Sequence, residues 1–338
     1  MDIIKTLAQE FSLRDQQVEQ TVALLDSGNT VPFIARYRKE MTGSLDDQVL
    51  RELNDRLEYL RGLEKRKEEV LAAIEGQDKL TEEISASLLS AKTLAEVEDI
   101  YRPFKQKRRT RASMAKEKGL EPLAHEIFRQ APASPSPLTL ATGYINREAG
   151  VETAEEALAG ALDIIAEAVS DNPKLRRLLR EYLLRSGTIK TSGKTEEQTV
   201  YSMYYDFSES VANIAGHRVL AIDRGEREGI LKVSLLCDRD VCLGFIEREL
   251  LGKPGPCVDA VKAACEDAFD RLLFPSLERE IRSFLTEQAA EASIKVFAVN
   301  LKQLLMQPPV KGAVTLGLDP AYRTGCKLAV VDSTGKVL

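Results

Sequence analysis

The sequence predicts a mainly α-helical chain with a few short strands and a β-hairpin near its C-terminal end. Apolar residues recur at helical spacing through most of the 338 residues. Several of these segments open on a capping box or stop at a glycine. The runs rich in β-branched residues are short and lie in the last third of the chain.

The N-terminal part is expected to hold two short helices, a loop and one long helix. Residues 2–11 and 14–27 carry apolar side chains at helical spacing, and residues 29–32 form the predicted loop. Residues 45–75 then show leucines at helical spacing with no proline before the stop at Gly76. This pattern predicts a single scaffold helix about 45 Å long.

Capping boxes and proline breaks set the helices that follow. Thr93–Glu96 opens a helix that reaches about Ile100, where Pro103 interrupts it, and Thr153–Glu156 opens another. The remaining predicted helices begin near Leu120 or span residues 173–186, 258–274 and 277–306.

Strands are expected at residues 230–236, 314–318 and 327–331, with a tight turn at 333–336. An isolated hairpin is marginally stable in water, so we expect the chain to be the N-terminal part of a longer protein.

Composition excludes several classes of protein. No apolar run approaches the roughly 20 residues of a membrane span, and the N-terminus lacks the features of a secretory signal, which predicts a cytoplasmic protein. The five cysteines form no C-x-x-C pair, so we expect neither a disulfide framework nor a zinc site, and we expect no cofactor.

A basic cluster is the best candidate for a nucleic-acid contact. The net charge is −6, yet Tyr101–Lys118 holds eight bases against one acid. The candidate contact residues there are Lys105, Lys107, Arg108, Arg109 and Arg111. Such groups can bind several phosphates. The alternative is a solvated loop whose arginines pair with acids on neighbouring helices.

Other motifs are weaker. A second small basic group, Arg36, Arg38 and Lys39, is either structural or flanks the first. Ser192–Thr195 resembles the end of a phosphate-binding loop but lacks the required glycine at position 188, so a turn is expected. Asp319 ends an apolar strand, where its carboxylate either caps a turn or is one ligand of a metal site.

Several separated segments together resemble the bacterial Tex family of transcription accessory proteins. They are Val31–Glu40, Thr42–Asp46, Tyr101–Glu121, Tyr205–Ser208, His217–Ala221, Arg224–Glu226 and Leu316–Lys327. The resemblance implies a Tex N-terminal helical region at 1–190, a central and mainly helical region at 191–310, and the first hairpin of a truncated RNase H-like (YqgF/RuvC-type) α/β domain at 311–338.

The resemblance also sets the functional expectation. Tex proteins carry helix-hairpin-helix modules and a C-terminal S1 domain, so RNA or DNA would bind mainly through an S1 domain missing from this chain. Asp319 aligns with the first-strand carboxylate of the RNase H-like fold, which the family is thought to carry in a catalytically degenerate form. Ala321 stands where the family pattern usually has glycine.

We therefore expect a noncatalytic scaffold of a nucleic-acid-binding transcription accessory protein. One alternative is a metal-dependent nuclease whose further acids lie beyond Leu338. Another is a module that docks on RNA polymerase or ribosome-associated proteins.

Overall fold

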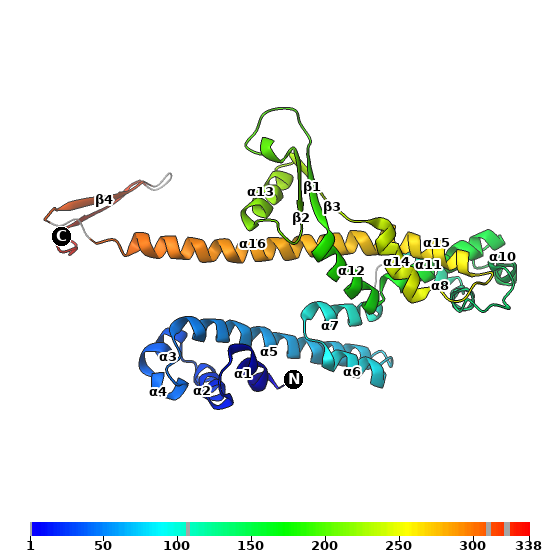
Figure 1. Cartoon of the computed structure of the whole chain (residues 1–338), viewed down its shortest axis with the longest axis horizontal. Coiled ribbons are helices and arrows are strands. Elements are labelled where there is room, and N and C mark those ends of the chain that lie inside the picture. Colours follow the sequence, from blue (N-terminus) through cyan, green and yellow to red (C-terminus); the bar gives the residue numbers. More distant parts are fainter. Residues whose placement is uncertain (1, 106–108, 309–311, 321–324) are drawn as a thin grey trace. The chain divides into compact units, whose positions relative to one another are not determined.

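The computed structural model describes residues 2–105, 109–308, 312–320 and 325–338, and it confirms a mainly helical fold with a few short strands (Figure 1). The chain divides into two compact units. Residues 1–184 and 237–278 form the first unit, and residues 185–236 and 279–338 form the second.

The first unit is built from helices. In chain order they are α1 (Ile3–Phe11), α2 (Asp15–Asp26), α3 (Val31–Tyr37), α4 (Lys39–Thr42), α5 (Asp47–Glu75), α6 (Glu82–Ser90), α7 (Leu94–Tyr101), η1 (Arg102–Phe104), α8 (Arg111–Glu117), α9 (Glu121–Phe128), α10 (Pro137–Ala141), η2 (Thr142–Tyr144), α11 (Ala154–Ser170), most of α12 (Pro173–Ser186), α14 (Arg239–Leu250), α15 (Val258–Asp267) and η4 (Ala268–Leu273).

The long predicted helix is α5, and α1, α2 and α3 lie along it (Figure 1). Asp46 caps α5 by accepting the Val49 N–H at 2.8 Å. The leucines of α5 recur every three or four residues, so they form one stripe. Its first half packs on α1 to α3, and its second half packs on α6 and α7.

The prediction of a loop at residues 29–32 was wrong for its last two residues. Helix α3 begins at Val31, and Pro32 lies in its first turn. Proline is favoured there because the first amides of a helix need no partner within it. The proline was therefore a start signal for a helix.

Helix α11 is the centre of the other half of the first unit, where α8, α9, α10, α15 and η4 pack on it. Small residues allow this close packing. Ala157 and Ala161 are fully buried, and a Cβ on Gly160 would lie 2.5 Å from Leu120.

The second unit contains a sheet that the sequence predicted only in part. Strands β1 (Thr188–Gly193), β2 (Asp206–Ser210) and β3 (Leu231–Leu236) pair antiparallel in the order β2-β1-β3. Only β3 was expected. Ser192 and Gly193, which were expected in a turn, end β1.

Helix α13 (Gly216–Arg227) packs on β3, and the later part of α16 (Phe274–Leu305) belongs to the same unit. Arg282 of α16 donates to Asp223 and Glu226 of α13, and Thr286 donates to Asp223 at 2.6 Å. These contacts attach α13 to α16.

The expected C-terminal hairpin is present. Strands β4 (Thr315–Asp319) and β5 (Lys327–Val331) pair antiparallel, and Asp319 lies opposite Lys327. Apolar side chains of the hairpin and of the end of α16 are exposed, among them Phe297, Leu316 and Leu328.

Candidate nucleic-acid interface

The predicted basic cluster lies on η1, the loop after it and the start of α8. Lys107 and Arg108 lie outside the described residues. Arg109 is exposed in the loop, and Arg111 is the exposed first residue of α8, as expected for a cluster at a helix start. Thr110 between them caps α8, accepting the Ser113 N–H at 3.0 Å.

Lys105 already has a partner within the protein. Its ammonium group donates to Glu98 and lies 5.5 Å from the centre of the Tyr101 ring. Glu98 also accepts from Arg66 Nε at 2.7 Å. Burial alone would raise the pKa of Glu98, but the hydrogen bonds from Lys105 and Arg66 outweigh it and hold that pKa below its usual range. Lys105 is therefore partly neutralised.

A buried ion cluster joins α7 to α12 beside this loop. Asp99 of α7 is 5 % exposed, and its two carboxylate oxygens accept from Arg176 Nε and Arg180 Nη2 of α12, each at 2.6 Å. Arg176 is itself 2 % exposed. Sequence reasoning missed this cluster, because its members are about 80 residues apart and helix packing alone brings them together.

Positive charge is concentrated around this cluster. Arg102 of η1 lies 3.3 Å from Asp171, and both Arg102 and Arg176 donate to Ser276 Oγ at 3.3 Å. Burial lowers the pKa of Arg102, and repulsion by the nearby Arg176 lowers it further. An anion that approached this region would relieve that repulsion.

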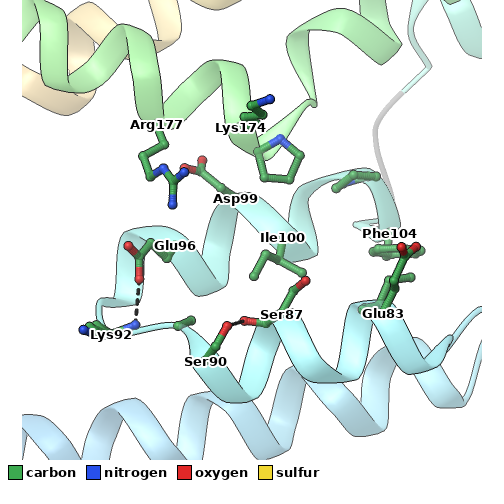
Figure 2. Close-up of a pocket in the computed structure, with 14 residues that line it drawn as sticks. Glu83, Ser87, Ser90, Lys92, Glu96, Asp99, Ile100, Phe104, Lys174 and Arg177 are labelled. Carbon is green, nitrogen blue, oxygen red and sulfur yellow. Dashed lines mark hydrogen bonds between the residues drawn. The ribbon is translucent and has the colours of Figure 1, made fainter. Parts of the chain in front are cut away.

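A hollow of about 830 Å³ opens between α6, α7 and the start of α12 (Figure 2). Figure 2 shows Lys174 and Arg177 on α12 on one side, and Ser87 and Ser90 on α6 on the other. The apolar residues Ile84, Ile100, Pro103, Phe104 and Pro173 also line the hollow.

Two of the three carboxylates that line this hollow have partners, and the third, Glu83, is exposed. Asp99 is held by its arginines, and Glu96 accepts the backbone N–H of Lys92 at 2.6 Å (Figure 2). Lys174 is paired with Glu249 at 2.6 Å. Within the described part of the chain, the exposed cations Lys92 and Arg177 form no ion pair.

A second hollow, of about 620 Å³, shares Pro103 and Pro173 with the first. Lys105, Thr110, Lys116 and His125 line it. Lys116 is paired with Glu121 at 3.0 Å. The two hollows therefore adjoin each other at η1 and the start of α12.

We use the name cationic surface for four exposed residues around these hollows. They are Lys92, Arg109, Arg111 and Arg177. None of the four forms a close ion pair with another residue that the structure describes, but Arg111 lies near enough to Asp163 to oppose the rise that burial causes in the pKa of that carboxyl. Two of them, Lys92 and Arg177, were not candidates from the sequence, because Lys92 stands apart from other bases and the bases around Arg177 lie within a predicted helix.

The second basic group does not join the cationic surface. Arg38 lies 5.3 Å from the centre of the Phe33 ring, and Arg36 and Lys39 line a separate hollow of about 430 Å³. Helix α3 packs near Leu50 of α5, whereas α7 packs near Val70. Twenty residues of helix separate these points by about 30 Å.

The remaining candidates are isolated. Asp319 is exposed at the end of β4. No three His, Cys, Asp or Glu side chains gather to hold a metal ion among the residues described here. No helix in the described ranges is long and apolar enough to cross a membrane.

The family of this chain follows from three sequence matches, which cover its N-terminal helices, its central part and its C-terminal hairpin. The sequence matches the Tex-like protein N-terminal domain over residues 1–75, the Tex central region-like family over 133–297 and the Tex protein YqgF-like domain over 313–338. The chain belongs to the Tex family, which confirms the resemblance read from its motifs.

Curated relatives come from bacteria and animals. "Uncharacterized protein YdcI" of Bacillus subtilis is 47% identical over 98% of this chain and 47% of its own length. "Transcriptional accessory protein Tex" of Neisseria gonorrhoeae is 40% identical over 100% of this chain and 45% of its own length. "S1 RNA-binding domain-containing protein 1" of Homo sapiens is 31% identical over 100% of this chain and 35% of its own length. The chain thus spans at most about half the length of these relatives.

Proposed function

We propose that this chain is a scaffold that binds the sugar-phosphate backbone of RNA or DNA through the cationic surface. The observation that carries the proposal is the position of four exposed cations, Lys92, Arg109, Arg111 and Arg177, around two adjoining hollows beside the buried Arg176. Unpaired exposed cations release counterions when phosphates replace them. A chain with a net charge of −6 would bind a polyanion only at such a local surface.

The names of the relatives support the same class of function. One is called a transcriptional accessory protein and another an S1 RNA-binding domain-containing protein. We propose a role for this chain in transcription elongation or RNA metabolism, in which an S1 domain supplies most of the affinity and the cationic surface adds contacts. RNA polymerase or ribosome-associated proteins are the proposed protein partners.

The buried ion cluster gives the surface its rigidity. Arg177 lies one residue from Arg176, which Asp99 anchors, so the position of Arg177 relative to α7 is fixed. A fixed cation loses less entropy on binding than a mobile one.

The scaffold is proposed to act without catalysis. The absence of catalysis is tested by incubating the chain with labelled RNA and Mg²⁺. Unchanged substrate supports the scaffold, and cleavage that Asp319→Asn abolishes would support the nuclease.

Binding is tested by the fluorescence anisotropy of a labelled single-stranded RNA between roughly 50 and 200 mM salt, a range over which phosphate contacts weaken strongly. The slope of log K against log salt is negative, and each lost phosphate contact lowers its magnitude by about 0.7 for a single strand. The double variant Lys92→Ala/Arg177→Ala should therefore lower the magnitude of the slope by about 1.4.

The matched control is Arg36→Ala/Lys39→Ala, which removes the same charge about 30 Å away along α5. It should leave the slope unchanged. Equal effects of the two double variants would show diffuse attraction and refute the proposed site. Binding of acidic proteins that free RNA does not compete away would instead favour a protein-interaction module.

A further inference from the structure

The first hollow has an apolar end and a cationic end. Helix α6 runs along it from Glu83 to Ser90, a rise of about 10 Å. Figure 2 shows Phe104 at the Glu83 end, and Lys92, which follows α6, at the other end. The volume of about 830 Å³ lies in the range of about 300–1,000 Å³ that is usual for ligand sites. The hollow therefore suits a ligand with one apolar part and one anionic part.

The core of the first unit fixes the apolar end. Ile84, Ile100 and Phe104 pack against the buried cluster that contains Leu63, and each remains partly exposed where it lines the hollow. The backbone carbonyl of Phe104 also accepts from Gln77 Nε2 at 3.1 Å. A planar apolar group can therefore stack on this end without first ordering it.

The positive charge lies away from the apolar end. Lys92 and Arg177 are exposed, and Figure 2 shows Arg177 reaching from α12 toward the same end as Lys92. The exposed Glu83 carboxylate would repel a phosphate at the apolar end. Asp99 also lines the hollow, but Arg176 neutralises it. An anionic group is therefore favoured at the Lys92 end.

We propose that this hollow binds one unpaired nucleoside of a single strand, with the base against Phe104 and the adjacent phosphate at Lys92 and Arg177. The inference rests on the proposed function, which places the sugar-phosphate backbone on the cationic surface, and adds a base as a second source of affinity. Ser87 and Ser90, between the two ends, offer hydroxyl groups to the sugar.

The chemistry of the hollow selects the state of the strand. A base in a duplex is stacked on its neighbours and paired, whereas an unpaired base can turn out of the strand and stack on an aromatic side chain. Every base has a flat face, so this contact tolerates any sequence.

The experiment is a cycle of two proteins and two strands. Fluorescence anisotropy measures the binding of a labelled single-stranded DNA and of an abasic strand of equal length, which keeps every phosphate and lacks every base. Wild type should bind the strand with bases at least about fivefold more tightly, the low end of the contribution of one stacked base. Phe104→Leu keeps an apolar side chain without the aromatic face, so it should lose most of this preference.

The matched control is Tyr37→Leu. Tyr37 is 59 % exposed and lies beside Arg36 in the second basic group, so this variant removes an aromatic ring next to a cation outside the hollow. It should keep the wild-type preference. Phe104→Leu removes no charge, so its salt slope should equal that of wild type.

A free nucleotide offers the same chemistry without a strand. Adenosine 5′-monophosphate should displace the labelled DNA only at concentrations far above the dissociation constant of the strand, because it lacks the flanking phosphates. Displacement at a concentration equal to that constant would assign the hollow to a free nucleotide and overturn the proposal.

The outcomes separate this inference from the proposed function. A reduced salt slope in Lys92→Ala/Arg177→Ala, together with equal binding of the two strands by wild type, would retain the proposed function and overturn the base site. Binding of neither strand would overturn both. The wild-type comparison needs no variant, so it decides even where Phe104→Leu fails to fold. Equal losses of preference in Phe104→Leu and Tyr37→Leu would also overturn the base site.

Discussion

Asp99→Asn removes the charge that holds α12 against α7 while keeping the shape of the side chain. Asp99 accepts two hydrogen bonds of 2.6 Å from arginines, and it is 5 % exposed. Breaking a buried ion pair from one side costs about 3–5 kcal/mol, because the remaining charge stays buried without compensation. Arg176 keeps its contact with Ser276, so we expect the lower value, about 3 kcal/mol.

The assay is thermal unfolding followed by circular dichroism. For a domain of roughly 150–250 residues, 1 kcal/mol shifts Tm by about 2–4 °C, so the expected loss is about 6–12 °C. Limited proteolysis should show earlier cleavage near η1 in the variant, because the contact that fixes α7 to α12 is weakened.

The matched control is Asp26→Asn. Asp26 also binds an arginine through two hydrogen bonds, to Arg61 at 2.7 and 2.8 Å, but both side chains are 47 % exposed. An exposed pair contributes less than about 1 kcal/mol. Equal shifts for Asp99→Asn and Asp26→Asn would refute the reasoning that burial sets the cost.

Three further predictions concern packing and pH. Gly193→Ala would place a methyl carbon 2.8 Å from the Tyr205 ring, so it should destabilise the central sheet by about 1–3 kcal/mol. Gly62→Ala adds a methyl group in open space in the middle of α5, so it should stabilise the chain by about 0.5–1 kcal/mol. Both changes in the free energy of unfolding are measured from the midpoints of urea unfolding. The hydrogen bonds from Arg61 hold the pKa of Asp26 below its usual range in the folded chain. The Asp26–Arg61 pair therefore stabilises the fold above about pH 4, and its contribution is lost as the pH falls through the lowered pKa of Asp26. The stability difference between wild type and Asp26→Asn should therefore vanish in acid; a difference that persists there would contradict the assignment.

Strong local signals predicted much of the helical fold. The capping box at Thr93 does open α7, with Thr93 accepting from Glu96 N–H at 3.2 Å, and the proline-free leucine pattern gave α5. These features act within one segment, so the sequence alone could reveal them.

Elements that depend on partners were missed. Strand β1 spans Thr188–Gly193, and only its Ile189 and Thr191 are buried. It therefore lacks an apolar run like the one from which β3 was predicted. Its pairing with β2 and β3 supplies the stability that its own sequence lacks.

The candidate interface was predictable only as a segment of basic residues. Arg109 and Arg111 lie in such a segment, whereas Arg177 reaches the same surface because Asp99 binds the neighbouring Arg176. The sequence also could not predict the ion pair between Lys105 and Glu98, because this pair depends on the packing of α7 beside η1.

The most direct test of the central claim is photo-crosslinking of the chain to a single-stranded RNA that carries 4-thiouridine, followed by mass spectrometry of the linked peptides. The account predicts crosslinks to peptides that contain residues 92–105, 109–111 and 173–180, which lie around the two hollows, and their loss in the Lys92→Ala/Arg177→Ala variant. Crosslinks confined to other parts of the chain, or crosslinks to these peptides that persist in the variant, would contradict it.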